Sequence, residues 1–275
     1  MAAWAYLVRR LSTVVGCFVA VFVVVVSTSD AGEPARNDAV RVLQMNLCDS
    51  GLARCYTGRS VGEAGDVIRA EAPDVVTLNE VCRDDVAPLE RALTDAGGGV
   101  VVSAFQPVWD RSTGEALRCR NGRSYGVALL TRSTGATHEA VGGTYPMQDT
   151  GSAELRAWLC LGPRTSATAA VTVCTTHLAS GDPAVAHAQC AYLTGTAIPA
   201  VAARTGSAPV ILGGDLNLRA DGSTCIPADH RRADDGHVQH VVATPGLAVG
   251  PSRTIAMPAT DHPGLLVTLT HEPRE

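Results

Sequence analysis

Acidic, amide and imidazole side chains recur in this sequence at the ends of short strand-like runs. In chain order they are Asn46, Glu80, His177, Asp215, Asn217, Asp261 and His262. Carboxylate oxygens are preferred ligands of hard divalent cations, and imidazole exchanges protons near neutral pH. Loops at the ends of buried strands commonly carry chemistry on a rigid scaffold. The residues together predict one site for metal-assisted hydrolysis of a phosphoester.

The segments that position these residues alternate between strand-like and helix-like patterns. Strands are predicted over 40–44, 74–80, 209–213, 238–243 and 264–270, and helices over 61–71, over 84–96 and from Asp182 onward. Four further strands are expected to form antiparallel neighbours, over 100–105, 125–131, 154–161 and 169–177. The pattern predicts a four-layer α/β sandwich, in which two packed, mainly antiparallel or mixed sheets have helices on both outer faces.

The first 29 residues differ in kind from the rest of the chain. Arg9 and Arg10 precede an apolar run over 11–26, and small residues follow it. Because this run is short for a membrane span, it predicts a secretory signal peptide over 1–29, with an N-terminal anchor as the alternative. Residues 30–275 are then expected to form a single catalytic domain, which is secreted or, with the anchor kept, lies outside the cell at the membrane.

Cysteine usage agrees with an oxidising compartment. One of nine cysteines, Cys17, lies in the leader, and the other eight allow up to four disulfides. Cys160 and Cys174 lie on successive predicted strands, where cross-strand neighbours meet at bridging distance. The other pairings follow less directly: Cys48 with Cys55 would close a short loop, and Cys82 with Cys119 and Cys190 with Cys225 are what remains.

Charge excludes a global basic surface for nucleic acid. All 22 basic residues are arginines, and the formal net charge is −5. Polyanion binding must therefore be local, and the cluster of Arg118, Arg120 and Arg123 is the best candidate for it. A solvated loop is an equally good interpretation of that cluster.

Five sequence blocks carry a resemblance to the endonuclease/exonuclease/phosphatase superfamily, which includes pancreatic-type deoxyribonucleases. They are Gln44-Met45-Asn46, Leu78-Asn79-Glu80-Val81, Thr176-His177-Leu178, Gly213-Gly214-Asp215-Leu216-Asn217 and Thr260-Asp261-His262-Pro263. Each block is weak alone, but their order and strand-like lead-ins extend over nearly the whole mature chain. The sequence is thus similar to a secreted bacterial member of this superfamily.

The resemblance implies a metal site. Glu80 is expected to be the principal Mg²⁺ ligand, with Asn46 and Asp261 close to the metal. Mn²⁺ and Ca²⁺ are the alternative ions. The alternative for Glu80 itself is an exposed residue at a strand end.

The resemblance also implies catalytic roles. His177 and His262 are expected to contact the scissile phosphate, since an imidazole can stabilise its negative charge. Asp215 would orient or deprotonate the attacking water, and Asn217 would hold a phosphate oxygen. Tyr125 matches a position where family nucleases carry a phosphate-contacting tyrosine, with a core tyrosine as the alternative.

Two arginines are candidates for substrate binding. Arg156 falls near a family arginine that contacts the substrate backbone, and Arg123 is the candidate from the arginine cluster. A surface arginine is the alternative in both cases.

One position departs from the family pattern. The family usually places an aspartate in the strand before the final block to orient the histidine matched by His262, but the segment here offers Gln239. An amide can fix an imidazole tautomer, yet it cannot stabilise imidazolium as a carboxylate does. Asp234 or Asp235 could take the role of that aspartate.

The sequence therefore predicts a secreted metal-dependent phosphodiesterase, a nuclease on DNA or RNA, that uses in-line attack of an activated water. One alternative is a lipid phosphodiesterase or phosphatase of the sphingomyelinase or phosphoinositide phosphatase type, because a shared fold does not choose the substrate. The other is a catalytically silent binding module. We expect a monomer with no stable protein partner, and membrane contact only if the N-terminal segment is uncleaved.

Overall fold

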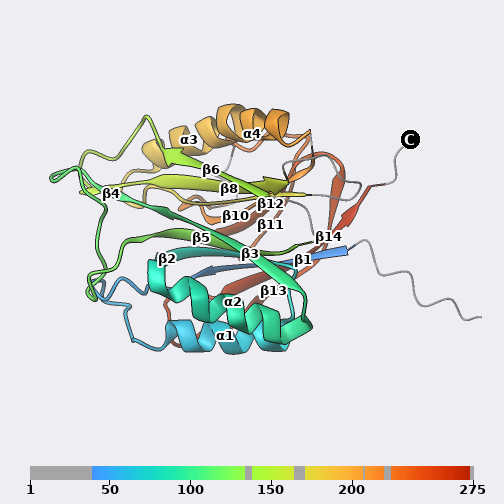
Figure 1. The fold of residues 1–275 in the computed structure, drawn as a ribbon. Helices are drawn as coiled ribbons and strands as arrows, with labels where there is room; N and C mark the ends of the chain where they lie inside the picture. Colours follow the sequence, from blue (N-terminus) through green and yellow to red (C-terminus); the bar gives the residue numbers. More distant parts are fainter. Residues whose placement is uncertain (1–38, 134–137, 164–170, 207, 220–223, 273–275) are drawn as a thin grey trace, which may run out of the picture. The chain divides into compact units, whose positions relative to one another are not determined.

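Two six-stranded β-sheets pack face to face, and helices cover their outer faces (Figure 1). The computed structural model describes residues 39–133, 138–163, 171–206, 208–219 and 224–272. The predicted signal peptide over 1–29 lies outside the described residues. In the part that is described, no helix is long and apolar enough to cross a membrane. The predicted four-layer α/β sandwich is confirmed.

The first sheet has the strand order β13–β14–β1–β2–β5–β3. Its strands are β1 (Ala39–Asn46), β2 (Val75–Cys82), β3 (Val100–Pro107), β5 (Tyr125–Ser133), β13 (Leu247–Ile255) and β14 (Gly264–His271). Helices α1 (Ser60–Glu71) and α2 (Val86–Gly97) pack on its outer face, and a 3₁₀ turn, Arg83–Asp85, joins β2 to α2. The parallel pair β1–β2 ends with Asn46 opposite Asn79, so Asn46 and Glu80 lie at one edge.

The second sheet has the order β11–β12–β10–β9–β8–β6. Its strands are β6 (His138–Thr144), β8 (Ala157–Pro163), β9 (Thr172–His177), β10 (Val210–Asp215), β11 (Arg231–Asp234) and β12 (Gln239–Ala243). Helix α3 (Pro183–Tyr192), a π-helical turn (Leu193–Ala197) and α4 (Ile198–Arg204) pack outside it. The parallel pair β9–β10 ends with His177 opposite Asp215.

The apolar core explains why the central strands are apolar on both faces. In β1, Val42 packs between the two sheets, whereas the next residue, Leu43, packs against α1 and α2. Successive strand side chains point to opposite faces, so a strand covered on both faces needs apolar residues at every position. Polar residues within such strands therefore need partners.

The predicted antiparallel pairing of four successive strands is confirmed for two pairs and wrong for the pair between them, and several edge strands were not predicted. β3 pairs with β5 and β8 pairs with β9, but β5 and β8 lie in different sheets, so the four strands are not successive neighbours. The strand predicted over 154–161 is divided at Arg156 into β7 (Glu154–Leu155) and β8, and β7 pairs with β4 (Trp109–Asp110). The missed strands β6, β11 and β13 lie at or next to sheet edges, where partial exposure weakens the apolar pattern.

Four disulfides join the eight cysteines in the pairs that the sequence analysis favoured. Cys160 and Cys174 face each other in the register of β8 and β9. The other bridges are Cys48–Cys55, Cys82–Cys119 and Cys190–Cys225. Two of them hold loops beside the strand ends of the first sheet, next to Asn46 and Glu80.

A buried acidic pair lies next to the Cys82–Cys119 bridge. Asp85 Oδ2 accepts a 2.6 Å hydrogen bond from the Cys82 amide, and the Asp85 and Asp49 carboxyls share a hydrogen bond. Burial, followed by the charges of Asp49 and Asp84, raises the pKa of Asp85 to about 7. Ser60 Oγ donates to Asp49 Oδ1 at 2.9 Å.

We expect Asp85→Asn to stabilise the protein at alkaline pH. The folded-state pKa of Asp85 exceeds its unfolded value, so the folded state binds more protons and stability falls as pH rises from about 4 to about 7. Thermal unfolding should therefore show a larger gain in Tm for Asp85→Asn at about pH 8 than at about pH 4. Asp95→Asn, which changes an exposed carboxylate on α2, is the control, and an equal gain for Asp85→Asn at both pH values would contradict this explanation.

Candidate active site

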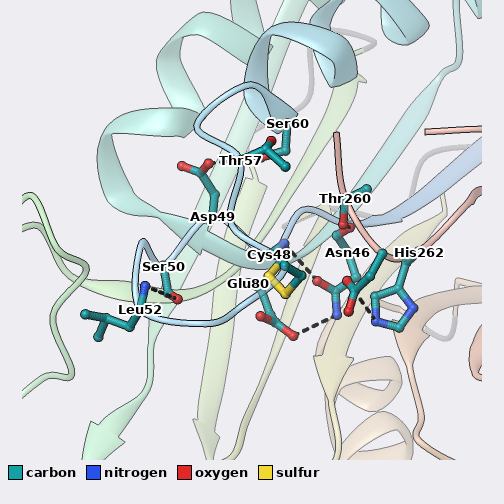
Figure 2. The surroundings of a disulfide bond; sticks show 12 residues. Asn46, Cys48, Asp49, Ser50, Leu52, Thr57, Ser60, Glu80, Thr260 and His262 are labelled. Carbon is teal, nitrogen blue, oxygen red and sulfur yellow. Dashed lines mark hydrogen bonds and ion pairs between the residues drawn. A yellow bond between two sulfur atoms is a disulfide. The ribbon is translucent and has the colours of Figure 1, made fainter. Parts of the chain in front are cut away.

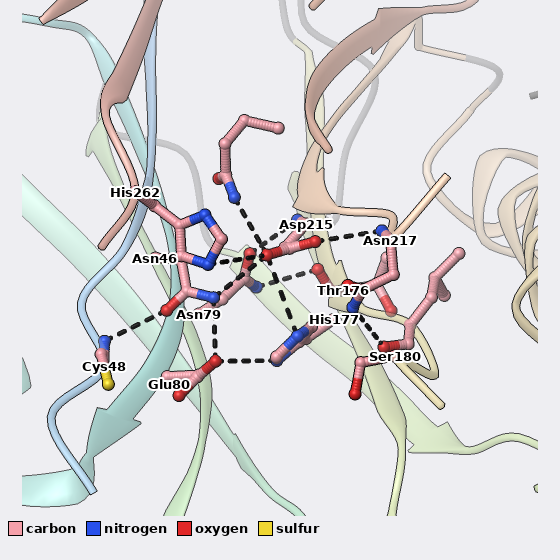
Figure 3. Close-up of polar contacts among 12 residues, drawn as sticks. Asn46, Cys48, Asn79, Glu80, Thr176, His177, Ser180, Asp215, Asn217 and His262 are labelled. Atoms are coloured by element: carbon pink, nitrogen blue, oxygen red, sulfur yellow. Dashed lines mark hydrogen bonds and ion pairs between the residues drawn. The ribbon is translucent and has the colours of Figure 1, made fainter. Parts of the chain in front are cut away.

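The ends of two parallel strand pairs, one from each sheet, bring the predicted site residues together (Figure 3). Asn46 and Glu80 come from β1 and β2, and His177 and Asp215 come from β9 and β10. Asn46, His177 and Asp215 are buried, and Glu80 is half-buried. The site thus lies between the two sheets at their common edge.

Asn46 bridges the two carboxylates of the site. Its Nδ2 donates to Glu80 Oε1 at 3.0 Å and to Asp215 Oδ2 at 3.1 Å, and its Oδ1 accepts from the Cys48 amide at 3.1 Å. Burial raises the pKa of both Glu80 and Asp215, and the charge of Asp215 raises that of Glu80 further. Two buried carboxylates on one amide are costly when both are ionised, and a divalent cation would relieve that cost. These hard oxygen donors fit a metal such as Mg²⁺.

A β-bulge places Glu80 in the site. The register between β2 and β5 shifts between Leu78 and Val81, and Glu80 has a φ of 56°. A non-glycine residue in this left-handed region is uncommon, and such strain concentrates at functional sites. The bulge leaves the Glu80 side chain on the wall of a cavity rather than in a regular sheet position.

His177 is held as a neutral imidazole with its proton on Nε2. Arg156 Nη1 lies 2.7 Å from His177 Nδ1, and because a guanidinium only donates, Nδ1 must be the acceptor. Burial, then the charges of Arg156 and His262, lower the pKa of His177 well below its usual value. Nε2 lies 3.9 Å from Asp215 Oδ2, and Nδ1 lies 3.9 Å from Glu80 Oε1.

Arg156, predicted to bind substrate, is held by the protein. It is buried, donates to Glu154 Oε1 at 3.0 Å and reaches Ser180 Oγ at 3.4 Å, besides its contact with His177. Its guanidinium lines the cavity, but its described contacts fix the orientation of His177. Glu154 and Ser180 were not among the residues predicted for the site.

Gln239 occupies a different place from the one expected. Its Nε2 donates to Asp215 Oδ2 at 3.0 Å, and its Oε1 accepts from Gln44 Nε2 at 2.8 Å. It therefore supports Asp215, which lies opposite it in the β10–β12 register, rather than His262. Among the described residues, no hydrogen bond joins Asp234 or Asp235 to His262, so the substitute suggested from the sequence is not found.

Asn217 folds back on the strand end. Its backbone amide donates to Asp215 Oδ1 at 3.0 Å, and its Nδ2 donates to Leu178 O at 2.9 Å. Its φ of 51° is again left-handed, as in a tight turn after a strand. An amide nitrogen carries two hydrogens, so Asn217 Nδ2 can donate its second hydrogen to a ligand.

His262 and Asp261 lie on the outer side of the site. His262 Nε2 is 3.7 Å from both Asp215 Oδ2 and Asp261 Oδ1. Asp261 is exposed, and its carboxylate lies near Cys48 and Cys55, which are joined as a disulfide and so are not a ligand set. Figure 2 shows the disulfide of Cys48 beside Asn46 and Glu80. The final block is tied to β1 through Thr260 Oγ1, which donates to Asn46 O at 2.9 Å.

A cavity of about 290 Å³ opens beside these residues. Buried Tyr125 lines it, and burial followed by the charges of Glu154 and Glu80 raises the pKa of its hydroxyl well above the usual value. Arg123 does not line the cavity, since its exposed guanidinium lies 4.0 Å from Asp84 Oδ2. Arg118, from the same arginine cluster, does line it.

A buried polar network beneath the site was missed by the sequence analysis. Asn79 Oδ1 accepts from Gln44 Nε2 at 2.7 Å and from the Asp215 amide at 2.8 Å, while its Nδ2 donates to Thr176 O at 2.8 Å. Thr77 Oγ1 donates to Gln44 Oε1 at 2.6 Å. The Asn79 bonds to the Asp215 amide and to Thr176 O cross between the sheets and fix the strand that carries Asp215, whereas the Gln44 bonds to Asn79 and Thr77 lie within the first sheet. Polar residues inside apolar strands were the signal that could have identified them.

Comparison with known proteins gives the family of this chain. The model of the endonuclease/exonuclease/phosphatase family matches residues 59–262, which is more than half of the chain. The chain therefore belongs to this family. Its members are hydrolases of phosphoester bonds and commonly use divalent metal ions such as Mg²⁺. A search of curated protein sequences found no match.

Solved structures share the fold. Truncated TDP2 from Caenorhabditis elegans is 18% identical, with a TM-score of 0.60 over 84% of this chain and 97% of that one. The human Nocturnin catalytic domain with bound sulfate is 17% identical, with a TM-score of 0.64 over 85% and 94%. A protein of the same family from Beutenbergia cavernae is 22% identical, with a TM-score of 0.58 over 85% and 72%. At these identities the likeness supports the fold alone.

Proposed function

We propose that this protein is a secreted, Mg²⁺-dependent phosphodiesterase that hydrolyses DNA, RNA or another nucleotide-type phosphodiester. The observation that carries the proposal is the Asn46 amide, which holds the Glu80 and Asp215 carboxylates together, with Glu80 on the wall of the cavity. Membership of a phosphoester-hydrolase family supports it. The four disulfides support an oxidising, extracellular location.

Glu80 is the principal metal ligand in this proposal, with Asn46 and the exposed Asp261 close by. When bound there, a divalent cation would neutralise negative charge on a phosphate oxygen. Asn46 keeps Glu80 in place through its Nδ2, and the bulge in β2 fixes the backbone of Glu80.

The protein groups perform the remaining steps. Asp215, whose pKa is raised by burial, accepts a proton from the water that attacks phosphorus in line with the leaving oxygen. The Nε2–H of His177 donates to a non-bridging phosphate oxygen, with its tautomer fixed by Arg156. His262 and Asn217 supply further donors, and Tyr125 contacts the substrate in the cavity.

A lipid phosphodiesterase is the second candidate, because one observation favours it. Leu52 lines the cavity and its side chain is 68% exposed, as expected of a residue that enters a lipid interface. Trp109, in the segment that the sequence analysis considered, is 37% exposed.

The experiment compares three substrates with the oxidised protein that starts at Asp30. Supercoiled plasmid, single-stranded RNA and sphingomyelin vesicles are each incubated with Mg²⁺ or with EDTA. Hydrolysis of plasmid or RNA that is lost in EDTA is the expected result. Hydrolysis of the vesicles alone would favour the lipid enzyme, and a folded protein inactive on all three would contradict the proposal.

A further inference from the structure

Two disulfide-bonded loops form the outer rim of the cavity. Cys48–Cys55 closes the loop after β1, and Cys82–Cys119 ties the loop before β5 to the end of β2, two residues beyond Glu80. The loops contact each other, because the Arg120 amide donates to Ser50 O at 2.8 Å. A Cβ on Gly51 would lie 2.6 Å from Arg120 Cβ, so only glycine permits this approach. The rim is therefore prearranged by covalent and backbone contacts.

The rim presents one apolar side and one cation to the cavity. Leu52, Ala53 and Leu117 supply the apolar side, and Arg118 supplies the charge. Among the described residues no carboxylate lies within ion-pair distance of Arg118, whose Nη1 donates only to Gly122 O, at 3.3 Å. Arg156, the other arginine of the cavity, already contacts Glu154 and His177. Arg118 thus keeps most of its donors for a ligand.

We propose that Arg118 and Leu52 form a second subsite of the active site, which binds a nucleotide-type group that carries a second phosphate. The inference rests on the proposed phosphodiesterase function and names the substrate class of that site. A guanidinium binds phosphate through two parallel hydrogen bonds, and apolar side chains contact the face of a base or sugar.

Size and charge restrict this subsite. A cavity of about 290 Å³ accommodates a group of roughly one nucleotide rather than a duplex. An unpaired arginine at the mouth attracts a phosphate and repels a cationic headgroup such as choline. The combination favours a nucleotide unit over a choline lipid.

The test uses two chromogenic substrates that differ in one phosphate. Thymidine 5′-(p-nitrophenyl phosphate) carries only the scissile phosphodiester, and its 3′-phosphorylated form carries a second phosphate. We expect wild-type kcat/KM to be about tenfold higher for the 3′-phosphorylated substrate, as a charge-assisted contact allows. Arg118→Gln should remove this preference by raising KM for the 3′-phosphorylated substrate to about the value for the other substrate.

Arg123→Gln is the matched control, because Arg123 belongs to the same cluster but does not line the cavity. It should keep the wild-type preference. Equal rates for both substrates in the wild type, or the same preference in Arg118→Gln, would overturn the subsite. Hydrolysis of neither substrate would instead count against the phosphodiesterase function. In that case, calorimetric binding of thymidine 3′,5′-bisphosphate in EDTA tests Arg118 separately. Unchanged affinity in Arg118→Gln would then overturn the subsite.

Discussion

Glu80→Gln is expected to lower kcat for phosphodiester hydrolysis by about a thousandfold or more. The amide keeps the size of Glu80 and one acceptor for the Asn46 Nδ2 bond, but it removes the charge that a divalent cation needs at this position. The loss should appear in kcat at saturating Mg²⁺ with any phosphodiester substrate. Glu90→Gln on α2, which changes the same group outside the site, should retain full activity.

The same variant has a readout that does not depend on turnover. Because half-buried Glu80 and buried Asp215 share one amide, removing one charge should raise Tm in EDTA relative to wild type. Mg²⁺ should raise the Tm of the wild type and leave that of Glu80→Gln nearly unchanged. A variant that keeps more than about a tenth of wild-type kcat, or that gains the same Tm with Mg²⁺, would refute the role of Glu80.

Asp215→Asn is expected to lower kcat by about a thousandfold through loss of the proton acceptor. Both oxygens of Asp215 accept hydrogen bonds, Oδ1 from the Asn217 amide and Oδ2 from Asn46 and Gln239. The NH₂ group of an asparagine must therefore face another donor whichever way it turns. This predicts no gain in Tm, in contrast to Glu80→Gln.

The measurement is single-turnover hydrolysis together with thermal unfolding. Asp234→Asn is the matched control, since Asp234 lies in β11 and accepts from the Gly236 amide instead of contacting the site. If Asp215→Asn lost less than about tenfold in the single-turnover rate, Asp215 would not be the base. Mg²⁺ should still raise the Tm of Asp215→Asn, because Glu80 is the principal ligand in the proposed site.

The central strands and the residues at their ends were predictable because each strand carries its own signal. Apolar runs before Asn46, Glu80, His177 and Asp215 gave both the strand and its end. The partners of these residues were not predictable in the same way. Gln44 and Asn79 are ordinary polar residues until the two sheets are packed, because the groups that satisfy them lie on other strands.

The positions of loop side chains could not be predicted from the sequence either. Arg118 and Arg123 are five positions apart in one arginine cluster, and no spacing rule decides which of them reaches the cavity. The disulfide from Cys119 and the contact of Arg120 with Ser50 decide it. Gln239 was expected beside His262, but the register of β12 on β10 places it opposite Asp215.

Hydrolysis of bis(p-nitrophenyl) phosphate tests the metal-dependent site at Glu80 most simply, because this substrate needs no recognition beyond the phosphodiester. Wild type, Glu80→Gln and Glu90→Gln are assayed in Mg²⁺ and in EDTA. We expect hydrolysis by wild type and Glu90→Gln in Mg²⁺, and none by Glu80→Gln or in EDTA. Hydrolysis that persists in EDTA or in Glu80→Gln would contradict a metal-dependent site built on Glu80, Asn46 and Asp215.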